Sequence, residues 1–345
     1  MKNVPHNSVS AGEKPAEVEI LDCTLRDGSY SVGFRFTEET VTRVLAGLEA
    51  SGIRLIELGH GLGLNAGEAL SKPSLVPDER CFELAGETLE EAAWGMFCIP
   101  GIAELHHLKA AAESGMRFVR IGLDVTDVPP GEEFLRYAKE LGLTAFANLM
   151  KTNALDLDGV VAAARACVEY GADGVYLVDS AGGCLPGRIR ELFGAVGAAV
   201  DVPLGFHGHD NLGLANANAL TAADAGARYV DATLDGIGRG AGNTVTESFA
   251  AILRSRGVGA AYDYRALATL SETAVRPLPR LHDDRTYQVV GGLTETHSSF
   301  FPLIARCAER QGVDLFELMT RVADVERVNP TEDLVMGVAS ALSAR

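Results

Sequence analysis

The chain has 345 residues, of which 47% are hydrophobic and 22% charged, values typical of a folded globular protein rather than a disordered one. Its 30 basic and 47 acidic side chains leave a formal net charge of −17. An acidic surface repels phosphate backbones and anionic lipid, so we expect no nucleic acid and no membrane as partner. The length suits one large domain with an appendage, or two ordinary domains.

The cysteines and the hydropathy pattern indicate a cellular compartment. No apolar run approaches the roughly 18 residues of a membrane span, and the N-terminus lacks the regions of a signal peptide. The six cysteines are scattered, without a C-x-x-C pair, and several lie inside apolar runs. This pattern indicates reduced, buried thiols rather than disulfides or structural zinc. We therefore predict a cytoplasmic protein.

The first residues, 1–17, are polar and without periodicity, and we interpret them as a flexible N-terminal tail. Short β-forming runs then alternate with helical patterns that stop at a glycine. The predicted strands are Ile20–Thr24, Leu55–Leu58, Trp94–Ile99, Phe118–Leu123, Thr144–Leu149, Gly174–Val178, Pro203–His207 and Tyr229–Thr233. The clearest predicted helices between them are Thr37–Ser51, Leu157–Tyr170 and Leu212–Ala225.

Strand, helix and glycine stop, repeated eight times, predict an α/β fold, a (β/α)8 TIM barrel over residues 18–258. A doubly wound sheet is the alternative, but it usually carries a glycine-rich turn after its first strand. Here Arg26-Asp27-Gly28-Ser29-Tyr30 follows that strand instead.

The strand rhythm is lost beyond about residue 258, and we predict an α-helical C-terminal domain over residues 259–345. Pro277 and Pro279 lie in a connecting segment of this part. The predicted helices are Tyr262–Val275, Ser298–Gln311, Asp314–Val325 and Thr331–Arg345.

Chemistry in a barrel of this kind sits at the C-terminal ends of the strands, and polar residues gather there. The pair His207-x-His209 is the most specific signal, because residues two apart on a strand share one face and both imidazoles can meet one metal. Asp27, at the end of the first strand, adds a carboxylate oxygen. Together they predict a divalent ion such as Mn2+ or Mg2+, with Co2+ as a further candidate. The alternative is that the histidines only pack at the top of the strand.

Other polar residues at the strand ends suggest substrate contacts. Arg26 beside a metal would hold an enolate or carboxylate oxygen, or form a salt bridge to Glu57 or Asp179. Ser180 can donate to a ligand carboxylate. The glycine-rich loop Gly236–Asn243 lacks the spacing of a dinucleotide site, and we interpret it as close packing that lets Asn243 reach the site as a second-shell residue. Further polar residues predicted to contact substrate are Glu57 and Lys151.

Three motifs together resemble the DRE-TIM metallolyase superfamily, and within it the 4-hydroxy-2-oxovalerate aldolases. They are Asp22-Cys23-Thr24-Leu25-Arg26-Asp27-Gly28, His207-Gly208-His209-Asp210-Asn211-Leu212-Gly213 and Gly240-Ala241-Gly242-Asn243. The resemblance runs from about residue 19 to the C-terminus. It implies a class II pyruvate-type aldolase, a carbon–carbon lyase that cleaves or forms a 4-hydroxy-2-oxo acid.

The resemblance also implies roles. A metal on Asp27, His207 and His209 would chelate the 2-oxo acid, pyruvate or 2-oxobutyrate, while Arg26 stabilises the enolate and Ser180 holds the carboxylate. The C-terminal domain would serve as a lid or would dock an acylating aldehyde dehydrogenase that receives the aldehyde. A homodimer or a heterotetramer with that partner is the implied assembly.

Two positions depart from the family pattern. The aldolases commonly carry His after Arg-Asp-Gly-Ser, as the base on the 4-hydroxyl, and here that residue is Tyr30. They commonly carry Tyr before the Ser-Ser-Phe of the C-terminal domain, and here that residue is His297. If the two segments face each other, the site still contains one histidine and one tyrosine, each in the position where the family has the other. We expect His297 to be the base, since imidazole titrates near neutral pH. The alternative is that both residues only line the pocket.

Rival functions remain at this point. Acyl-CoA Claisen condensation or cleavage belongs to the same superfamily, but its lyase loop normally carries a cysteine that Leu234–Asn243 lacks. A metal-free Schiff-base aldolase would depend on Lys151. A catalytically inactive partner subunit of an aldehyde dehydrogenase is the third alternative, and the intact motif set weighs against it.

Overall fold

The computed structural model describes residues 18–281 and 284–344, so the predicted tail over residues 1–17 lies outside the described part of the chain. Within that part, eight parallel strands close into a barrel in chain order, with β1 paired to β8. They are β1 Glu19–Leu25, β2 Leu55–Leu58, β3 Ala93–Cys98, β4 Phe118–Asp124, β5 Thr144–Met150, β6 Gly174–Asp179, β7 Leu204–Gly208 and β8 Ala227–Ala232. The predicted TIM barrel and its strands are confirmed.

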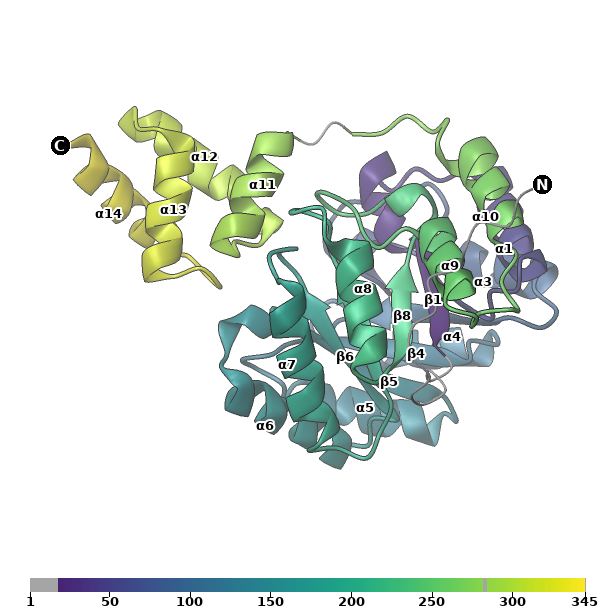
Figure 1. Cartoon of the computed structure of the whole chain (residues 1–345). Helices are drawn as coiled ribbons and strands as arrows, with labels where there is room; N and C mark the ends of the chain where they lie inside the picture. Colours follow the sequence, from purple (N-terminus) through teal and green to yellow (C-terminus); the bar gives the residue numbers. More distant parts are fainter. Residues whose placement is uncertain (1–17, 282–283, 345) are drawn as a thin grey trace, which may run out of the picture.

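Helices cover the outside of the barrel (Figure 1). They are α1 Glu38–Ala50, α2 Ala66–Ala69, α3 Asp78–Thr88, α4 Leu105–Glu113, α5 Gly131–Glu140, α6 Leu157–Glu169, α7 Pro186–Gly197, α8 Ala215–Asp224 and α9 Thr246–Ser255. Local sequence sets their starts: the hydroxyl of Thr37 accepts a bond of 3.2 Å from the N–H of Thr40 at α1. Asp156 likewise accepts from the N–H of Gly159 at 2.9 Å to begin α6.

Three strands are followed by short 3-10 turns instead of passing directly into a helix: η1 Asp27–Val32 after β1, η2 Thr152–Ala154 after β5 and η3 Leu234–Gly236 after β8. Chain order places these turns at the C-terminal mouth of the barrel. The predicted site residues Asp27, Tyr30 and Lys151 therefore lie on or beside short turns that begin at strand ends.

The barrel interior is apolar in one layer and ionic in the next. Alternate residues of each strand point inward. One cluster of inward residues is formed by Leu21, Cys23, Phe118, Phe146 and Tyr176. Farther along the same strands lie buried charged side chains, of which Arg120 is completely buried at 0% exposure. A charged layer at this depth requires internal partners for every ion.

The C-terminal part contains α10 Tyr264–Leu270, the π-turn η4 Ser271–Val275, α11 Arg285–Thr294, η5 Ser298–Phe300, α12 Phe301–Gln311, α13 Leu315–Val325 and α14 Glu332–Ser343. Leu267 and Leu270 of α10 belong to the barrel core, whereas a separate core joins α12, α13 and α14. Figure 1 shows α11–α14 as a group to one side of the barrel. The predicted helical character is confirmed, and the domain boundary at residue 258 stays a prediction.

Helix α11 is the element that sequence patterns did not indicate. It contains the pair Gly291-Gly292, which lowers helix propensity. The fold requires these glycines, because an added Cβ on Gly291 would lie 2.3 Å from the ring of Phe301 and one on Gly292 would lie 2.9 Å from the Cβ of Asn211. Close packing in the tertiary structure therefore overrides local propensity here.

A pair of glycines tests how far close packing contributes to stability. Gly52 and Gly142 both have positive φ, but an added Cβ at Gly52 would lie 2.1 Å from the carbonyl oxygen of Ala261, and one at Gly142 meets nothing within 4 Å. We expect Gly142→Ala to lower the free energy of unfolding by about 1 kcal/mol through backbone strain alone. Gly52→Ala should lower the free energy of unfolding by about 1–3 kcal/mol more than Gly142→Ala, because of the clash with Ala261. Urea denaturation measures both, and equal losses would contradict the packing argument.

Candidate metal centre

The three predicted metal ligands converge at the barrel mouth. Asp27 begins η1 after β1, His207 lies in β7 and His209 follows β7 directly. All three are buried, and their ligand atoms all lie within 4.8 Å of one another. The structure therefore brings together residues that are almost two hundred positions apart in the sequence, and that they bind a metal stays a prediction.

Hydrogen bonds set the tautomers of both histidines. Nδ1 of His207 lies 2.8 Å from Oδ2 of Asp231, and Nδ1 of His209 lies 3.1 Å from the carbonyl oxygen of Gly242. Both partners are acceptors, so each neutral ring carries its proton on Nδ1 and keeps its lone pair on Nε2. A ligand histidine typically donates its other ring N–H to a carboxylate or carbonyl in this way.

The electrostatics of Asp27 favour its ionised form. Arg26 donates to Oδ1 at 2.7 Å, and the side-chain amide of Asn243 donates to Oδ2 at 2.6 Å. Burial disfavours the charge, but Arg26, His209 and His207 together hold the pKa of Asp27 well below its usual range. Oδ1 of Asn243 is buried and has no hydrogen-bond partner among the described residues. A carboxylate, two imidazole lone pairs and this spare oxygen suit a divalent ion.

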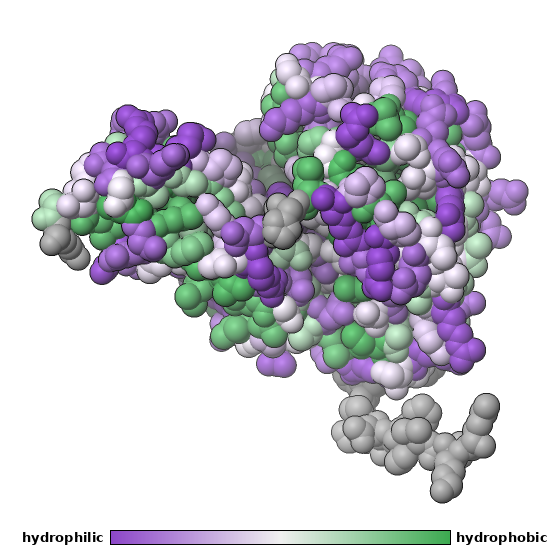
Figure 2. Space-filling view, turned by 90° about the horizontal axis from the view of Figure 1, so that it is seen from above, coloured by the Kyte–Doolittle hydropathy of each residue, from purple (hydrophilic) through white to green (hydrophobic). Residues whose placement is uncertain are grey.

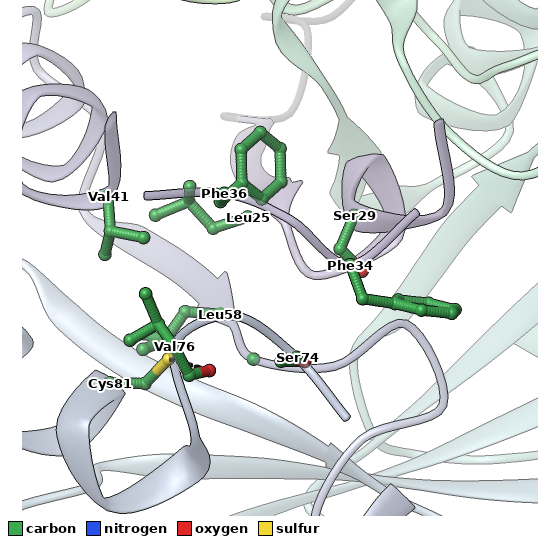
Figure 3. Close-up of a pocket in the computed structure, with 10 residues that line it drawn as sticks. Leu25, Ser29, Phe34, Phe36, Val41, Leu58, Ser74, Val76 and Cys81 are labelled. Carbon is green, nitrogen blue, oxygen red and sulfur yellow. Dashed lines mark hydrogen bonds between the residues drawn. The ribbon is translucent and has the colours of Figure 1, made fainter. Parts of the chain in front are cut away.

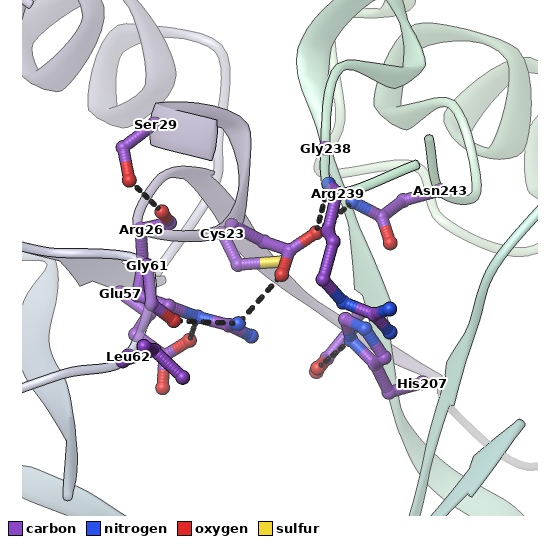
Figure 4. A network of polar contacts seen from close by, with 12 residues as sticks. Cys23, Arg26, Ser29, Glu57, Gly61, Leu62, His207, Gly238, Arg239 and Asn243 are labelled. Atoms are coloured by element: carbon purple, nitrogen blue, oxygen red, sulfur yellow. Dashed lines mark hydrogen bonds and ion pairs between the residues drawn. The ribbon is translucent and has the colours of Figure 1, made fainter. Parts of the chain in front are cut away.

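Arg26 is held beside the three predicted ligands by a second carboxylate. Its Nε donates to Glu57 at 2.6 Å (Figure 4). Its guanidinium also lies over the ring of Phe97, 4.8 Å from the ring centroid. Arg120 also binds Glu57, with Nε 2.8 Å from Oε1. Burial opposes the charge of Glu57, but the two arginines lower its pKa overall. The expected salt bridge between Arg26 and Glu57 is therefore present, and it fixes the guanidinium rather than removing it from the site.

Ser180 and Lys151 occupy neighbouring positions at the mouth. The hydroxyl oxygen of Ser180 accepts a bond from the backbone N–H of Lys151 at 2.9 Å, which leaves its own hydrogen free to donate. The ammonium of Lys151 bonds to Asp124 at 2.9 Å and to Asn329 of the C-terminal part at 2.7 Å. Glu57 and Lys151 are thus both engaged within the protein, and their contact with substrate stays a prediction.

Tyr30 stands on η1, with its ring against the backbone of Gly61, where an added Cβ would lie 2.4 Å from the ring. Phe34 packs edge-to-face on it, with ring centroids 5.3 Å apart. Burial raises the pKa of Tyr30 to about 12, against the opposing effect of Arg239. The phenol therefore keeps its proton near neutral pH and can act as a hydrogen-bond donor.

His297 caps η5 and lies close enough to the barrel mouth to respond to its charges. Burial first, and then Arg239, His209 and Lys151, lower its pKa well below the usual value. The backbone N–H of Ser299 donates to its Nδ1 at 3.2 Å, so in this geometry the neutral ring carries its proton on Nε2. The imidazole is therefore unprotonated at neutral pH, with its lone pair held by Ser299.

Arg239 is a residue of the site that the sequence patterns did not indicate. Its Nη2 lies 2.7 Å from Nε2 of His209 and 3.0 Å from the carbonyl oxygen of Ser180, and its Nη1 bonds to the hydroxyl of Ser298. Its backbone N–H donates to Asp27 at 3.2 Å. The available signal was a lone arginine among the glycines of the loop after the last strand. Its side chain links the barrel mouth to the C-terminal part.

Two other features do not extend the site. Cys23 lies near His207 and Asp231, but burial raises the pKa of its thiol well above the usual value, and Arg120 already neutralises Asp231. An apolar pocket beside η1 contains no charged group (Figure 3). Burial raises the pKa of its one thiol, Cys81, to about 12, so it offers neither a nucleophile nor a ligand.

Comparison with known proteins decides the family. The family model described as HMGL-like matches residues 17–274, which is most of the chain. The chain belongs to the HMGL-like family. Among curated relatives of this HMGL-like protein, a 4-hydroxy-2-oxovalerate aldolase of Carboxydothermus hydrogenoformans is 36% identical over 95% of this chain and 98% of its own. A second, 4-hydroxy-2-oxovalerate aldolase 2 of Nocardia farcinica, is 35% identical over 95% of both chains.

A solved structure shares the fold of this family member at lower identity. The carboxyl transferase domain of Rhizobium etli pyruvate carboxylase superposes with a TM-score of 0.75 at 20% identity. The match covers 96% of this chain and 61% of the other. The barrel and the C-terminal helices thus recur together in a distant protein.

Arg239 provides a test of the metal centre. A metal held through Nε2 of His209 would use the lone pair that Arg239 now contacts, and the two cations repel each other. We expect Arg239→Met to strengthen Mn2+ binding by about tenfold or more, measured by titration with detection of free Mn2+. Arg165→Met, which removes an exposed arginine of α6, is the control and should leave the affinity unchanged. Weaker binding by Arg239→Met would mean that Arg239 supports the ligands instead.

Proposed function

We propose that the protein is a divalent-metal-dependent aldolase that cleaves or forms a 4-hydroxy-2-oxo acid, with pyruvate or 2-oxobutyrate and an aldehyde as the other reactants. One observation carries the proposal: Asp27, His207 and His209 meet beside a fixed Arg26 at the mouth of the barrel. The curated relatives that match nearly the whole chain bear the name of such an aldolase. Mn2+ or Mg2+ suits the oxygen and imidazole donors, and Co2+ is a further candidate.

The residues divide the work around the substrate. The ion, when bound, supplies a Lewis acid for the oxygens of the 2-oxo acid. Arg26 stabilises the negative charge that develops on the 2-oxo oxygen as the C3–C4 bond breaks, and Glu57 keeps its guanidinium in place. The hydroxyl of Ser180 donates to the substrate carboxylate. Asn243 holds the carboxylate of Asp27 from the side opposite to Arg26.

His297 and Tyr30 are the candidates for proton transfer. Cleavage requires a base that takes the proton from the 4-hydroxyl, while the electrons of the C3–C4 bond pass to the 2-oxo acid fragment and the aldehyde leaves. Because its pKa is lowered, His297 is unprotonated at neutral pH and can accept the proton, while Tyr30, whose pKa is raised, keeps its proton and can orient the hydroxyl as a donor. In this role, Nδ1 of His297 gives up the hydrogen bond from the backbone N–H of Ser299 and accepts one from the 4-hydroxyl of the substrate.

The rival functions have less support. All six cysteines are free, and the thiol of Cys23, which lies near His207, is buried and has its pKa raised well above the usual value, which does not suit the catalytic cysteine of an acyl-CoA lyase. The ammonium of Lys151 is bonded to Asp124 and Asn329, which does not suit a Schiff-base nucleophile. The intact ligand set also argues against an inactive partner subunit of an aldehyde dehydrogenase.

The C-terminal helices suit the docking role that we propose for residues 259–345. They expose Val289, Leu293 and Val325 at 40%, 73% and 65%. Figure 2 shows apolar residues gathered on these helices. An acylating aldehyde dehydrogenase that receives the aldehyde is the proposed partner, in a heterotetramer, with a homodimer as the alternative.

No helix in the described residues is long and apolar enough to cross a membrane. The unpaired thiols support our proposal of a cytoplasmic location.

The first test joins metal binding to cleavage. Purified enzyme with Mn2+ is offered a panel of 4-hydroxy-2-oxo acids, and released pyruvate or 2-oxobutyrate is measured. Asp27→Ala and His209→Ala should lose both the bound ion and turnover, because the developing charge loses its Lewis acid. His106→Ala removes an exposed histidine of α4 and serves as the control. Full activity after removal of metal by EDTA would refute the proposal.

The second test assigns the base by pH dependence. Because burial and nearby cations lower the pKa of His297, its unprotonated form persists below the usual imidazole range, so the ascending limb of kcat/KM should lie below about pH 6.5. His297→Ala should remove this limb and suppress cleavage. Tyr30→Phe should lower kcat only about tenfold, since it removes one hydrogen bond. If Tyr30→Phe abolishes activity while His297→Ala keeps most of it, Tyr30 and not His297 is the base.

A further inference from the structure

A continuous chain of buried ion pairs runs across the barrel interior from Arg26 to His207. Arg26 binds Glu57, Glu57 binds Arg120, Arg120 binds Asp231, and Asp231 binds His207. Glu57 and Arg120 are 0% exposed and Asp231 is 1% exposed. The chain therefore connects the arginine beside the site to one of its metal-ligand candidates entirely through the protein interior.

Asp231 sets the tautomer and the ring orientation of His207. Its Oδ2 accepts from Nδ1 of His207 at 2.8 Å and also from Arg120, while its Oδ1 has no hydrogen-bond partner among the described residues. A carboxylate in this position fixes the proton on Nδ1, the orientation of the ring and the lone pair on Nε2. That lone pair is what His207 can offer to the cluster with Asp27 and His209.

Arg120 joins the two halves of the chain. Its Nε and Nη2 bind Glu57, its Nη1 binds Asp231, and its guanidinium lies over the ring of Tyr176 at 4.9 Å. A planar guanidinium can hold two carboxylates at fixed angles, which an ammonium cannot do. Buried ion pairs of this kind add little net stability over apolar side chains of similar volume, because desolvating the charges is costly. Stability alone therefore gives no reason for a charged layer at this depth.

We propose that Asp231 and Arg120 are positioning residues of the metal centre. Asp231 holds His207 in the tautomer that keeps Nε2 available beside Asp27 and His209. Arg120 links the carboxylate of Asp231 to that of Glu57. Through this link, His207 and Arg26 keep fixed positions relative to each other. The inference deepens the proposed function and relies on it for the role of His207.

The experiment uses the full-length protein and reads metal affinity and tautomer separately from activity. Asp231→Ala should weaken Mn2+ binding about 10- to 100-fold, and Asp231→Asn, which keeps an acceptor for Nδ1, should weaken it less. Asp22→Asn is the matched control, because Asp22 is an equally buried strand carboxylate that bonds to Thr24 and Thr246 instead. It should leave the affinity unchanged. Circular dichroism and thermal unfolding report whether each variant folds.

Nitrogen-15 NMR of the histidine side chains reports the tautomer of His207 without added metal. Wild type should show a proton on Nδ1 and none on Nε2, and Asp231→Ala should lose this fixed state. Arg120→Lys tests the link between the halves: it should lower Mn2+ affinity and kcat together, with a smaller change in KM. An Asp231→Ala variant that folds and keeps its affinity within about twofold would overturn the proposal, as would an Nε2-protonated His207 in wild type.

These outcomes separate the positioning role from the proposed function. A wild type that binds Mn2+ but cleaves no 4-hydroxy-2-oxo acid would refute the aldolase, while the variants at Asp231 would still decide the positioning role. A wild type that binds no Mn2+ would refute the metal centre, and the tautomer measurement alone would then decide whether Asp231 orients His207. If Asp231→Ala does not fold, Asp231→Asn and the wild-type tautomer keep the proposal falsifiable.

Discussion

The constraint on which the site depends is the pairing of charges inside a closed barrel. Arg26, Glu57, Arg120 and Asp231 lie where water cannot solvate them, so each of these side chains depends on an oppositely charged group within hydrogen-bonding distance. Removing one member would leave a neighbour buried and uncompensated. Side chains at the mouth are therefore oriented by partners deeper in the barrel. The paired arginines also lower the pKa of Glu57.

Burial and nearby charges also give the groups at the mouth different protonation states. Asp27 stays ionised because nearby groups, Arg26 foremost, lower its pKa against the effect of burial. Tyr30 stays protonated because burial dominates, and His297 stays neutral because burial and nearby cations act in the same direction. An ionised carboxylate, a protonated phenol and a neutral imidazole are thus held in different protonation states by their surroundings. The proposed acid–base chemistry beside a metal relies on such a difference.

The C-terminal helices have side-chain contacts with the barrel mouth. Arg239 reaches from the loop after β8 to Ser298, and Lys151 reaches from the end of β5 to Asn329. Any movement of these helices would therefore change contacts at His209 and Ser180, which Arg239 also touches.

The sequence by itself determined the barrel, its eight strands and the cluster of Asp27, His207 and His209. Strand period, glycine stops and the position of polar residues at strand ends are local signals, and parallel strands of a barrel bring those ends together without further information. It did not indicate α11, whose glycines make sense only against Phe301 and Asn211. Nor did it indicate Arg239, Arg120 or Asp231 as parts of the site. Their partners are distant in the chain, and only barrel closure decides which buried charges meet.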